Sequence, residues 1–220
     1  MSLTWTSLYT NETLTRANFV TNLRTRIDAD VEDSEILTDT QAIVWITAGL
    51  ENISFFTGLL KEFAEETCDG SEYYDLPTDL VKLDEVTYID SGGNNFYTLI
   101  NTNMGEVSAN GFSTATQKFY VRQGNRLYLY GTPTTGTIRI YGTRMPTTPS
   151  EDSSYIDLPA QYLELLYLFC EWKYWRRRRE ADEAALSRQL YFDMLERVRQ
   201  DVDDELSHGA SMYGKKLTRT

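Results

Sequence analysis

The residues of this chain whose types could do acid–base or metal chemistry are one histidine and many carboxylates. His208 is the only histidine among 220 residues, and it precedes Gly209 at an expected helix end. A general base or a metal ligand needs oriented partners, but the nearby acids follow no recognised ligand spacing. The chain has 33 carboxylates, and no spacing singles out the pair that a glycoside hydrolase needs. We therefore expect no catalytic residue, no metal site and no cofactor.

Two further patterns would indicate chemistry if they were complete. Asp90-Ser91-Gly92-Gly93 lacks the spacing and the Lys-Ser/Thr ending of a phosphate-binding loop, so it predicts a turn. Cys68 and Cys170 are far apart in the sequence, and neither has a Cys or His at metal-ligand spacing. We expect both thiols to be reduced and Cys170 to lie in the core.

The sharpest charge feature is a run of four arginines, from Arg176 to Arg179. Four consecutive helical residues point in four directions, about 100° apart, so they cannot form one basic face. Three of them have an acid four residues later, which in a continuous helix gives weak ion pairs of ~0.2–0.3 kcal/mol each. The run indicates either a solvated helix or helix–helix corner, or a contact with an acidic partner subunit.

The residues after this run could let a neighbouring helix come close. Small side chains stand at the start of the next helix. They precede an apolar seam at 3–4 spacing, which ends at Val202 and is interrupted by Arg188. Together with the arginine run, this pattern predicts a surface for contact between subunits. The candidate contact residues are Arg176, Arg178, Arg179, Ala181, Ala184 and Arg188.

The C-terminal segment, residues 207–220, is basic and too short to bury a core of its own. It carries three basic side chains and no acid. The segment is either a frayed terminus or an arm that becomes ordered on a partner, for example by adding a strand to a sheet edge. In the second interpretation the binding residues are Met212, Tyr213, Lys215, Lys216, Leu217 and Arg219.

The charge distribution argues against tight binding of nucleic acid. The net charge is −12, of which residues 1–70 carry −8, residues 71–158 carry −4 and residues 159–220 carry none. Non-specific DNA binding needs a basic face that releases counterions, so an acidic body lets DNA pass without gripping it. The alternative is that the charge only maintains solubility. No apolar run approaches the ~18–20 residues that span a bilayer, so we expect no membrane contact.

The elements that must position these residues fall into three sections. Helical patterns cover residues 12–66 and 158–206, and strand patterns cover residues 73–148. The predicted fold is α+β and mainly α, a helical bundle with an inserted antiparallel β region and an extended C-terminal arm. We expect one domain over residues 1–206, followed by the arm.

Local signals set several element boundaries. Thr38 and Gln41 fit a capping box at a helix start, and the apolar stripe that follows could continue to Glu66. The clearest hairpin spans residues 118–129, and we treat residues 101–116 as a loop. Tyrosines on the outward phase of the strands indicate either a binding face or side chains that fit a half-exposed sheet. These tyrosines are Tyr97, Tyr120, Tyr128, Tyr130 and Tyr141.

Short motifs, found in order over nearly the whole chain, carry a resemblance to one known family. They are Tyr74-Asp75-Leu76-Pro77 at the entry to the strands, Leu127-Tyr128-Leu129-Tyr130-Gly131 and Gly136-Thr137-Ile138-Arg139-Ile140-Tyr141 in paired strands, and Asp157-Leu158-Pro159 before the penultimate helix. With these motifs the chain resembles the head-to-tail adaptor proteins of tailed bacteriophages. The resemblance implies a non-enzymatic ring subunit, usually in twelve copies, at the head–tail junction of the virion and made in the host cytoplasm.

The same resemblance implies a set of partners. They are the portal protein, a downstream neck or tail protein and other copies of the chain, with double-stranded DNA passing through the lumen without specific binding. In such proteins the C-terminal segment reaches the portal, which is the role expected here for residues 207–220. Two rival functions are another tail-completion or baseplate module that binds through the tyrosine-rich strands, and a cell-wall hydrolase built on scattered carboxylates.

Overall fold

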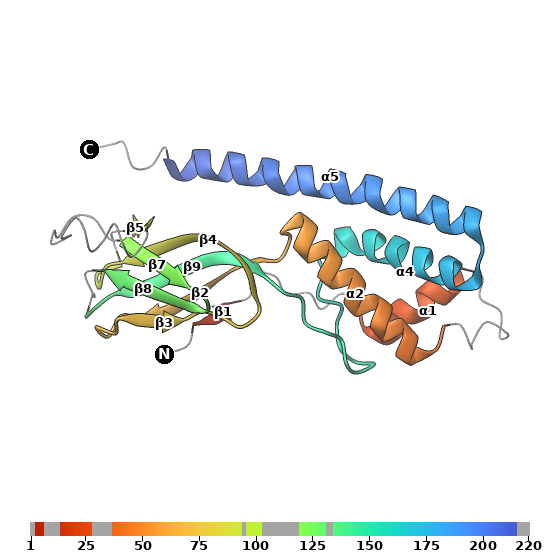
Figure 1. The fold of residues 1–220 in the computed structure, drawn as a ribbon, viewed down its shortest axis with the longest axis horizontal. Helices are drawn as coiled ribbons and strands as arrows, with labels where there is room; N and C mark the ends of the chain where they lie inside the picture. The colour runs from red at the N-terminus through yellow and green to blue at the C-terminus, as the bar shows by residue number, and fades with distance from the viewer. Residues whose placement is uncertain are drawn as a thin grey trace. The chain divides into compact units, whose positions relative to one another are not determined.

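The structure is a computed structural model that describes residues 3–6, 14–27, 37–93, 96–102, 119–130 and 134–214. For Thr6, Phe96, Tyr130 and residues 203–214 it describes the backbone alone. The chain divides into two compact units (Figure 1). The β unit comprises Met1–Leu8 and Lys61–Arg144, and the helical unit comprises Tyr9–Leu60 and Met145–Thr220.

The expected helical bundle with an antiparallel insertion is wrong. Over the part of the chain that the structure describes, four α-helices and nine strands in two sheets form a mixed α/β fold, 44% helical and 28% strand. Each unit buries a hydrophobic cluster of its own. The expectation treated the strands as an insertion and not as a unit with its own core. Most strands pair with partners that are distant in sequence, so local sequence patterns do not reveal this core.

Helices α1 (Arg16–Arg26) and α2 (Asp39–Thr57) both begin at a threonine cap. The Thr38 hydroxyl accepts a hydrogen bond from the Gln41 N–H at 3.1 Å, which confirms the predicted cap. The Gln41 side chain accepts a hydrogen bond from Arg177, so it ties the start of α2 to α4. The cap therefore fixes where α2 begins and also helps to position a residue of the arginine run.

The expected continuation of α2 to Glu66 is wrong. The helix ends at Thr57, where Gly58 takes a φ of 64° at the C-cap, a left-handed conformation that glycine adopts readily. The chain then forms strand β2 (Lys61–Thr67), which pairs along its whole length with β9 (Thr137–Arg144). This long-range pairing overrides the helix-like spacing of the apolar residues.

The last third of the chain is helical, as expected. The 3₁₀ turn η2 (Ala160–Tyr162) follows Pro159 and leads into α4 (Leu163–Arg178), and α5 spans Ala181–Gly214. The helix end expected at Gly209 is wrong, because α5 continues through it. The C-terminal segment is therefore helical as far as Gly214, and residues 215–220 lie outside the described residues.

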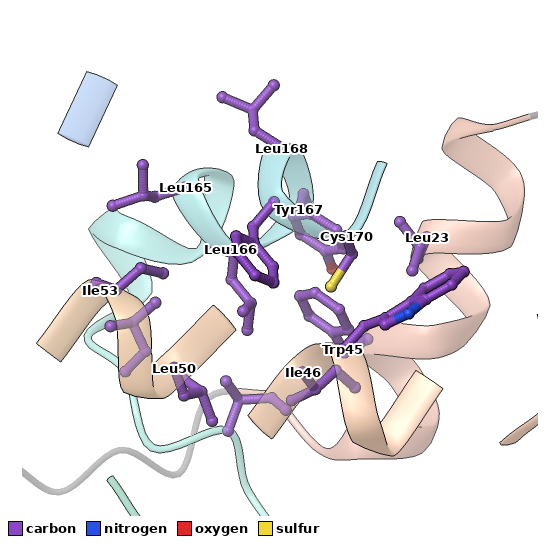
Figure 2. Packing of buried hydrophobic residues seen from close by; sticks show 14 of the residues in the cluster. Leu23, Trp45, Ile46, Leu50, Ile53, Leu165, Leu166, Tyr167, Leu168 and Cys170 are labelled. Atoms are coloured by element: carbon purple, nitrogen blue, oxygen red, sulfur yellow. The ribbon is translucent and has the colours of Figure 1, made fainter. Parts of the chain in front are cut away.

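Helices α1, α2, α4 and α5 enclose the core of the helical unit, and Figure 2 shows buried side chains of the first three. Gly49 lets α2 and α4 approach closely, since a Cβ at this position would lie 2.6 Å from Leu166 Cδ1 and 2.9 Å from Phe169 Cδ1. Cys170 is fully buried in this core, as predicted. Burial raises the pKa of its thiol, so it stays protonated at neutral pH.

The β unit contains two sheets. In the five-stranded sheet the order is β1 (Thr4–Thr6), β2, β9, β4 (Leu80–Ile89), β5 (Phe96–Thr98). In the four-stranded sheet the order is β3 (Tyr73–Asp75), β8 (Arg126–Tyr130), β7 (Phe119–Gln123), β6 (Ile100–Asn101). Strands β6 and β7 pair in parallel, so the expectation of purely antiparallel strands is also wrong.

The predicted hairpin is confirmed. Strands β7 and β8 pair from Phe119↔Tyr130 to Gln123↔Arg126, which leaves a two-residue loop. Gly124 takes a φ of 57° at the first loop position, where a positive φ favours glycine. The expected loop over residues 101–116 begins after β6, and residues 103–118 lie outside the described residues.

Candidate partner-binding surfaces

The arginine run lies at the corner between α4 and α5. Helix α4 ends at Arg178, Arg179 takes a φ of 67°, and α5 begins at Ala181. The ion pairs expected from a continuous helix are wrong, because the i,i+4 geometry that they require is interrupted there. The structure therefore places the run at a helix–helix corner.

The four arginines are all exposed at this corner, and they point to different surroundings. Arg177 donates a hydrogen bond to Gln41 Oε1, and Arg178 donates one to the Tyr174 hydroxyl at 3.1 Å. The other two, Arg176 and Arg179, are exposed as well. The corner thus concentrates positive charge at one end of the helical unit in an otherwise acidic chain.

We expect Arg179→Gly to stabilise the helical unit. A non-glycine residue in the left-handed conformation costs ~1–2 kcal/mol, and glycine relieves this strain. Glycine also loses more conformational entropy on folding, which offsets ~0.5–1 kcal/mol of the gain. The free energy of unfolding, measured in urea, should rise by ~0.5–1 kcal/mol. Arg178→Gly is the matched control, and it should destabilise by up to ~1 kcal/mol, because the last residue of α4 keeps a helical backbone that glycine disfavours. A loss of stability in Arg179→Gly would show that the arginine side chain itself holds the corner.

The candidate contact residues of α5 lie in different environments. Ala181 is exposed and Ala184 is half-buried. Arg188 does not belong to the buried seam, because Ser187 takes that position. The Arg188 guanidinium is exposed and lies over the rings of Trp172 and Phe192, 5.8 and 5.6 Å from their centroids. Arg188 thus covers aromatic surface of its own unit and keeps a charge available to solvent.

Helix α2 has a second apolar face, which the sequence analysis missed. We define the α2 stripe as Val44, Ala48, Glu51 and Phe55, which are spaced 4–3–4 and lie on one side of the helix. Val44 is 54% exposed and Phe55 67% exposed, while the buried residues of α2 lie on the opposite side. The signal in the sequence was this second 4–3–4 series, beside the one that forms the core.

Helix α5 has a stripe with the same spacing. We define the α5 stripe as Leu186, Leu190, Asp193 and Arg197. Leu186 is 54% exposed and Leu190 47% exposed, and the buried seam of α5 lies on the other side of the helix. Exposed apolar side chains at helical spacing are typical of a surface that packs against another protein.

The strand tyrosines do not form one outward face. Tyr120 is buried in the core of the β unit, which contradicts its expected outward position. Tyr128 packs against Tyr73 with ring centroids 5.7 Å apart, and Tyr141 packs against Phe63 at 6.2 Å. Tyr97 is exposed, and the side chain of Tyr130 lies outside the described residues. The tyrosines therefore serve mainly as cross-strand pairs and core residues.

The arm residues are the least defined of the candidates. Met212 and Tyr213 lie in the last turn of α5, where only the backbone is described. The other four, Lys215, Lys216, Leu217 and Arg219, lie outside the described residues. The portal-binding role of this segment stays a prediction.

The described residues offer no obvious centre for chemistry. Within the ranges that the structure describes, His, Cys, Asp and Glu side chains nowhere form a group of three or more that could hold a metal ion. The side chain of His208 is outside the described residues. In the described part of the chain, the helices are each too short or too polar to cross a bilayer.

Comparison with known families gives a match over most of the chain. Residues 15–213 match the family described as SU10 adaptor protein, so the match covers both units and most of the chain. The result confirms the resemblance to phage head-to-tail adaptors. Proteins of this family are structural, non-enzymatic components of phage particles. A search of curated proteins gave no match to this chain.

Proposed function

Because this chain belongs to the SU10 adaptor protein family, we propose that it is a ring subunit that joins the portal to the tail. The ring encloses a channel through which double-stranded DNA enters and leaves the head. The chain acts by packing and electrostatics and carries out no reaction. Twelve copies is the expected number, by similarity to other head-to-tail adaptors.

The exposed stripes on α2 and α5 carry the proposal of a ring. A ring needs two different faces on each subunit, so that every copy presents one face and receives the other. The α2 stripe and the α5 stripe lie on different helices of the same unit, and both expose large apolar side chains to solvent. Such surfaces are costly to leave in water, and packing between copies would cover them.

The charge of the chain supports the proposed DNA channel. The net charge of −12 repels the phosphate backbone, so DNA can slide past without being held. Basic residues are concentrated at the α4–α5 corner and at the C-terminus, where contacts with acidic protein surfaces are expected. This separation of charge fits a channel protein whose cations serve protein–protein contacts.

The course of α5 supports attachment to the portal through the C-terminal segment. The backbone of α5 continues for three further turns after Val202, to Gly214. Lys215, Lys216 and Arg219 follow this helix directly in the sequence. Basic side chains at such a place would speed docking onto an acidic surface and make it sensitive to salt.

Imaging of assembled particles tests the ring directly. Averaged cryo-electron micrographs of virions should show many copies of this chain around the channel at the head–tail junction. Particles that contain only one or two copies would rule out a ring.

Deleting residues 207–220 should abolish attachment to the portal and leave the subunit folded. The deletion removes the last turns of α5 and none of the residues described in the core, so we expect the helical circular dichroism signal to fall only by these turns and the urea midpoint to stay unchanged. Its affinity for purified portal should fall at least ~tenfold, which corresponds to ~1.4 kcal/mol.

A variant with Lys215, Lys216 and Arg219 replaced by glutamine is the matched control for charge. It should bind the portal more slowly, and its binding should depend less on salt. If the truncated protein attaches with unchanged affinity, the attachment site lies on the body of the chain and not on this segment.

A further inference from the structure

The α2 stripe has the composition of a helix–helix contact and not of a solvated surface. A helix with one face in water normally carries polar residues there. Here Val44 and Phe55 expose large apolar side chains, Ala48 is half-buried against the core of its own unit, and the ring of Phe55 packs edge-on against Phe56 at 5.4 Å. The one charged residue in the stripe is Glu51, which makes no ion pair within the described residues. An unbalanced acid between apolar residues indicates a partner that supplies a cation.

The charges along the whole of α2 also favour a partner that supplies a cation. From Asp39 to Thr57 it contains two acids, Asp39 and Glu51, and no basic residue. Two copies of the α2 stripe would bring acids and no cation to the contact, so the stripe is a poor match for itself. A suitable partner helix is apolar at the same spacing and carries a cation near the level of Glu51.

The α5 stripe meets these requirements when the two helices are aligned in parallel. Its residues repeat the 4–3–4 spacing, so placing Val44 beside Leu186 also places Ala48 beside Leu190. In this alignment Glu51 is level with Asp193, and Arg197 lies four residues further, or ~6 Å along the axis at ~1.5 Å per residue. Arg197 can therefore reach the carboxylates of Glu51 and Asp193, and its aliphatic stem can cover Phe55.

Asp39, the other acid of α2, lies away from this contact. It precedes Val44 by five residues, which places it about 140° around α2 from the stripe. It pairs with Arg24 of its own unit at 3.0 Å. The contact therefore has to supply a cation for Glu51 alone.

We propose that the α2 stripe of one copy packs in parallel against the α5 stripe of the next copy. The inference rests on the proposed ring and names the faces that build it. The contact is heterologous, because each copy gives its α2 stripe to one neighbour and its α5 stripe to the other. In the helical unit, α2 and α5 run in the same general direction (Figure 1), so rotation about an axis near that direction keeps neighbouring helices parallel.

A pair of cysteines tests this contact in assembled particles. Both native cysteines are buried, so introduced thiols should dominate the reaction with a short bismaleimide. The variant V44C/L186C should give a ladder of dimers, trimers and larger multimers on a denaturing gel. V44C alone and L186C alone should stay monomeric, because each places only one thiol in every contact. V44C/A185C is the matched control, since Ala185 is exposed but lies about 100° around α5 from Leu186.

The outcomes separate this inference from the proposed function. Particles with many copies of V44C/L186C but no ladder would overturn the contact and leave the ring intact. Dimers from V44C alone would show a symmetric contact and also overturn it. Particles with one or two copies of the wild-type chain would overturn the ring itself.

A charge exchange gives an independent test that needs no cysteine. Arg197→Glu should lower the number of copies per particle, because it leaves Glu51 and Asp193 without their shared cation, and the double variant Glu51→Arg/Arg197→Glu should restore it. Loss of copies in Arg197→Glu without recovery in the double variant would argue against this pairing.

Discussion

Replacing Tyr191 by alanine should lower the free energy of unfolding of the helical unit by about 3–5 kcal/mol, the range for removing a large buried side chain. Tyr191 is fully buried on α5, and its hydroxyl donates a hydrogen bond to Asn52 Oδ1 of α2 at 2.5 Å. Its ring packs against Phe169 and Trp172 of α4, with centroids 5.3 and 6.2 Å away. One side chain therefore joins three helices, and alanine would leave a cavity between them.

Urea unfolding followed by tryptophan fluorescence measures this loss in the unit concerned. Of the four tryptophans, Trp45, Trp172 and Trp175 belong to the helical unit, so its transition dominates the signal. Tyr191→Phe is the matched control and should cost only ~1–3 kcal/mol, since it keeps the packing but leaves the Asn52 amide without this partner. Burial raises the pKa of Tyr191, so the hydroxyl donates this bond across the neutral range. If both variants cost the same, the hydrogen bond and not the cavity sets the stability.

The sequence predicted those parts of the fold that depend on local signals. The threonine cap of α2, the start of the last helices after Pro159 and the β7–β8 hairpin are all set within a few residues of chain. Cap and turn residues act through their own backbone neighbours, so their meaning does not depend on the rest of the molecule. Because these signals are local, short motifs were also enough to indicate the family resemblance.

The errors arose where distant residues decide the structure. Residues after Gly58 have a helix-like apolar spacing, but the pairing of Phe63 with Tyr141 makes them a strand. The expected break at Gly209 failed because α5 continues through it, although glycine costs a helix only ~1 kcal/mol. Composition alone could not show that the strands bury their own core, since that depends on which strands pair.

The candidate surfaces also combine local signals, which the sequence shows, with features that depend on distant residues. The corner arginines were visible as a charge run, but their separation by the left-handed turn at Arg179 depends on where α4 ends. The sequence also contained the α2 and α5 stripes as second 4–3–4 series. Only the structure shows which of the two series on each helix is buried, and therefore which one is free to meet a partner.

Arg144→Met should destabilise the β unit by about 3–5 kcal/mol, because it removes the cation that neutralises a buried carboxylate. Arg144 Nε lies 3.0 Å from Glu62 Oε2, and the side chains are 12% and 2% exposed. The two residues lie at the end of β9 and the start of β2, where the chain leaves and enters this unit. Hydrogen exchange at the amides of β2 measures the effect, and protection should fall in proportion to the lost stability.

The double variant Glu62→Gln/Arg144→Met separates the ion pair from simple packing. Glutamine keeps the shape of Glu62 but carries no charge, so the penalty for a buried carboxylate disappears. The double variant should therefore recover much of the lost protection, since breaking one side of a buried pair costs more than replacing both sides. If the double variant is as unstable as Arg144→Met, the arginine acts through its packing and its other contacts in the unit, and the charge of Glu62 has little part in the stability of β2 and β9.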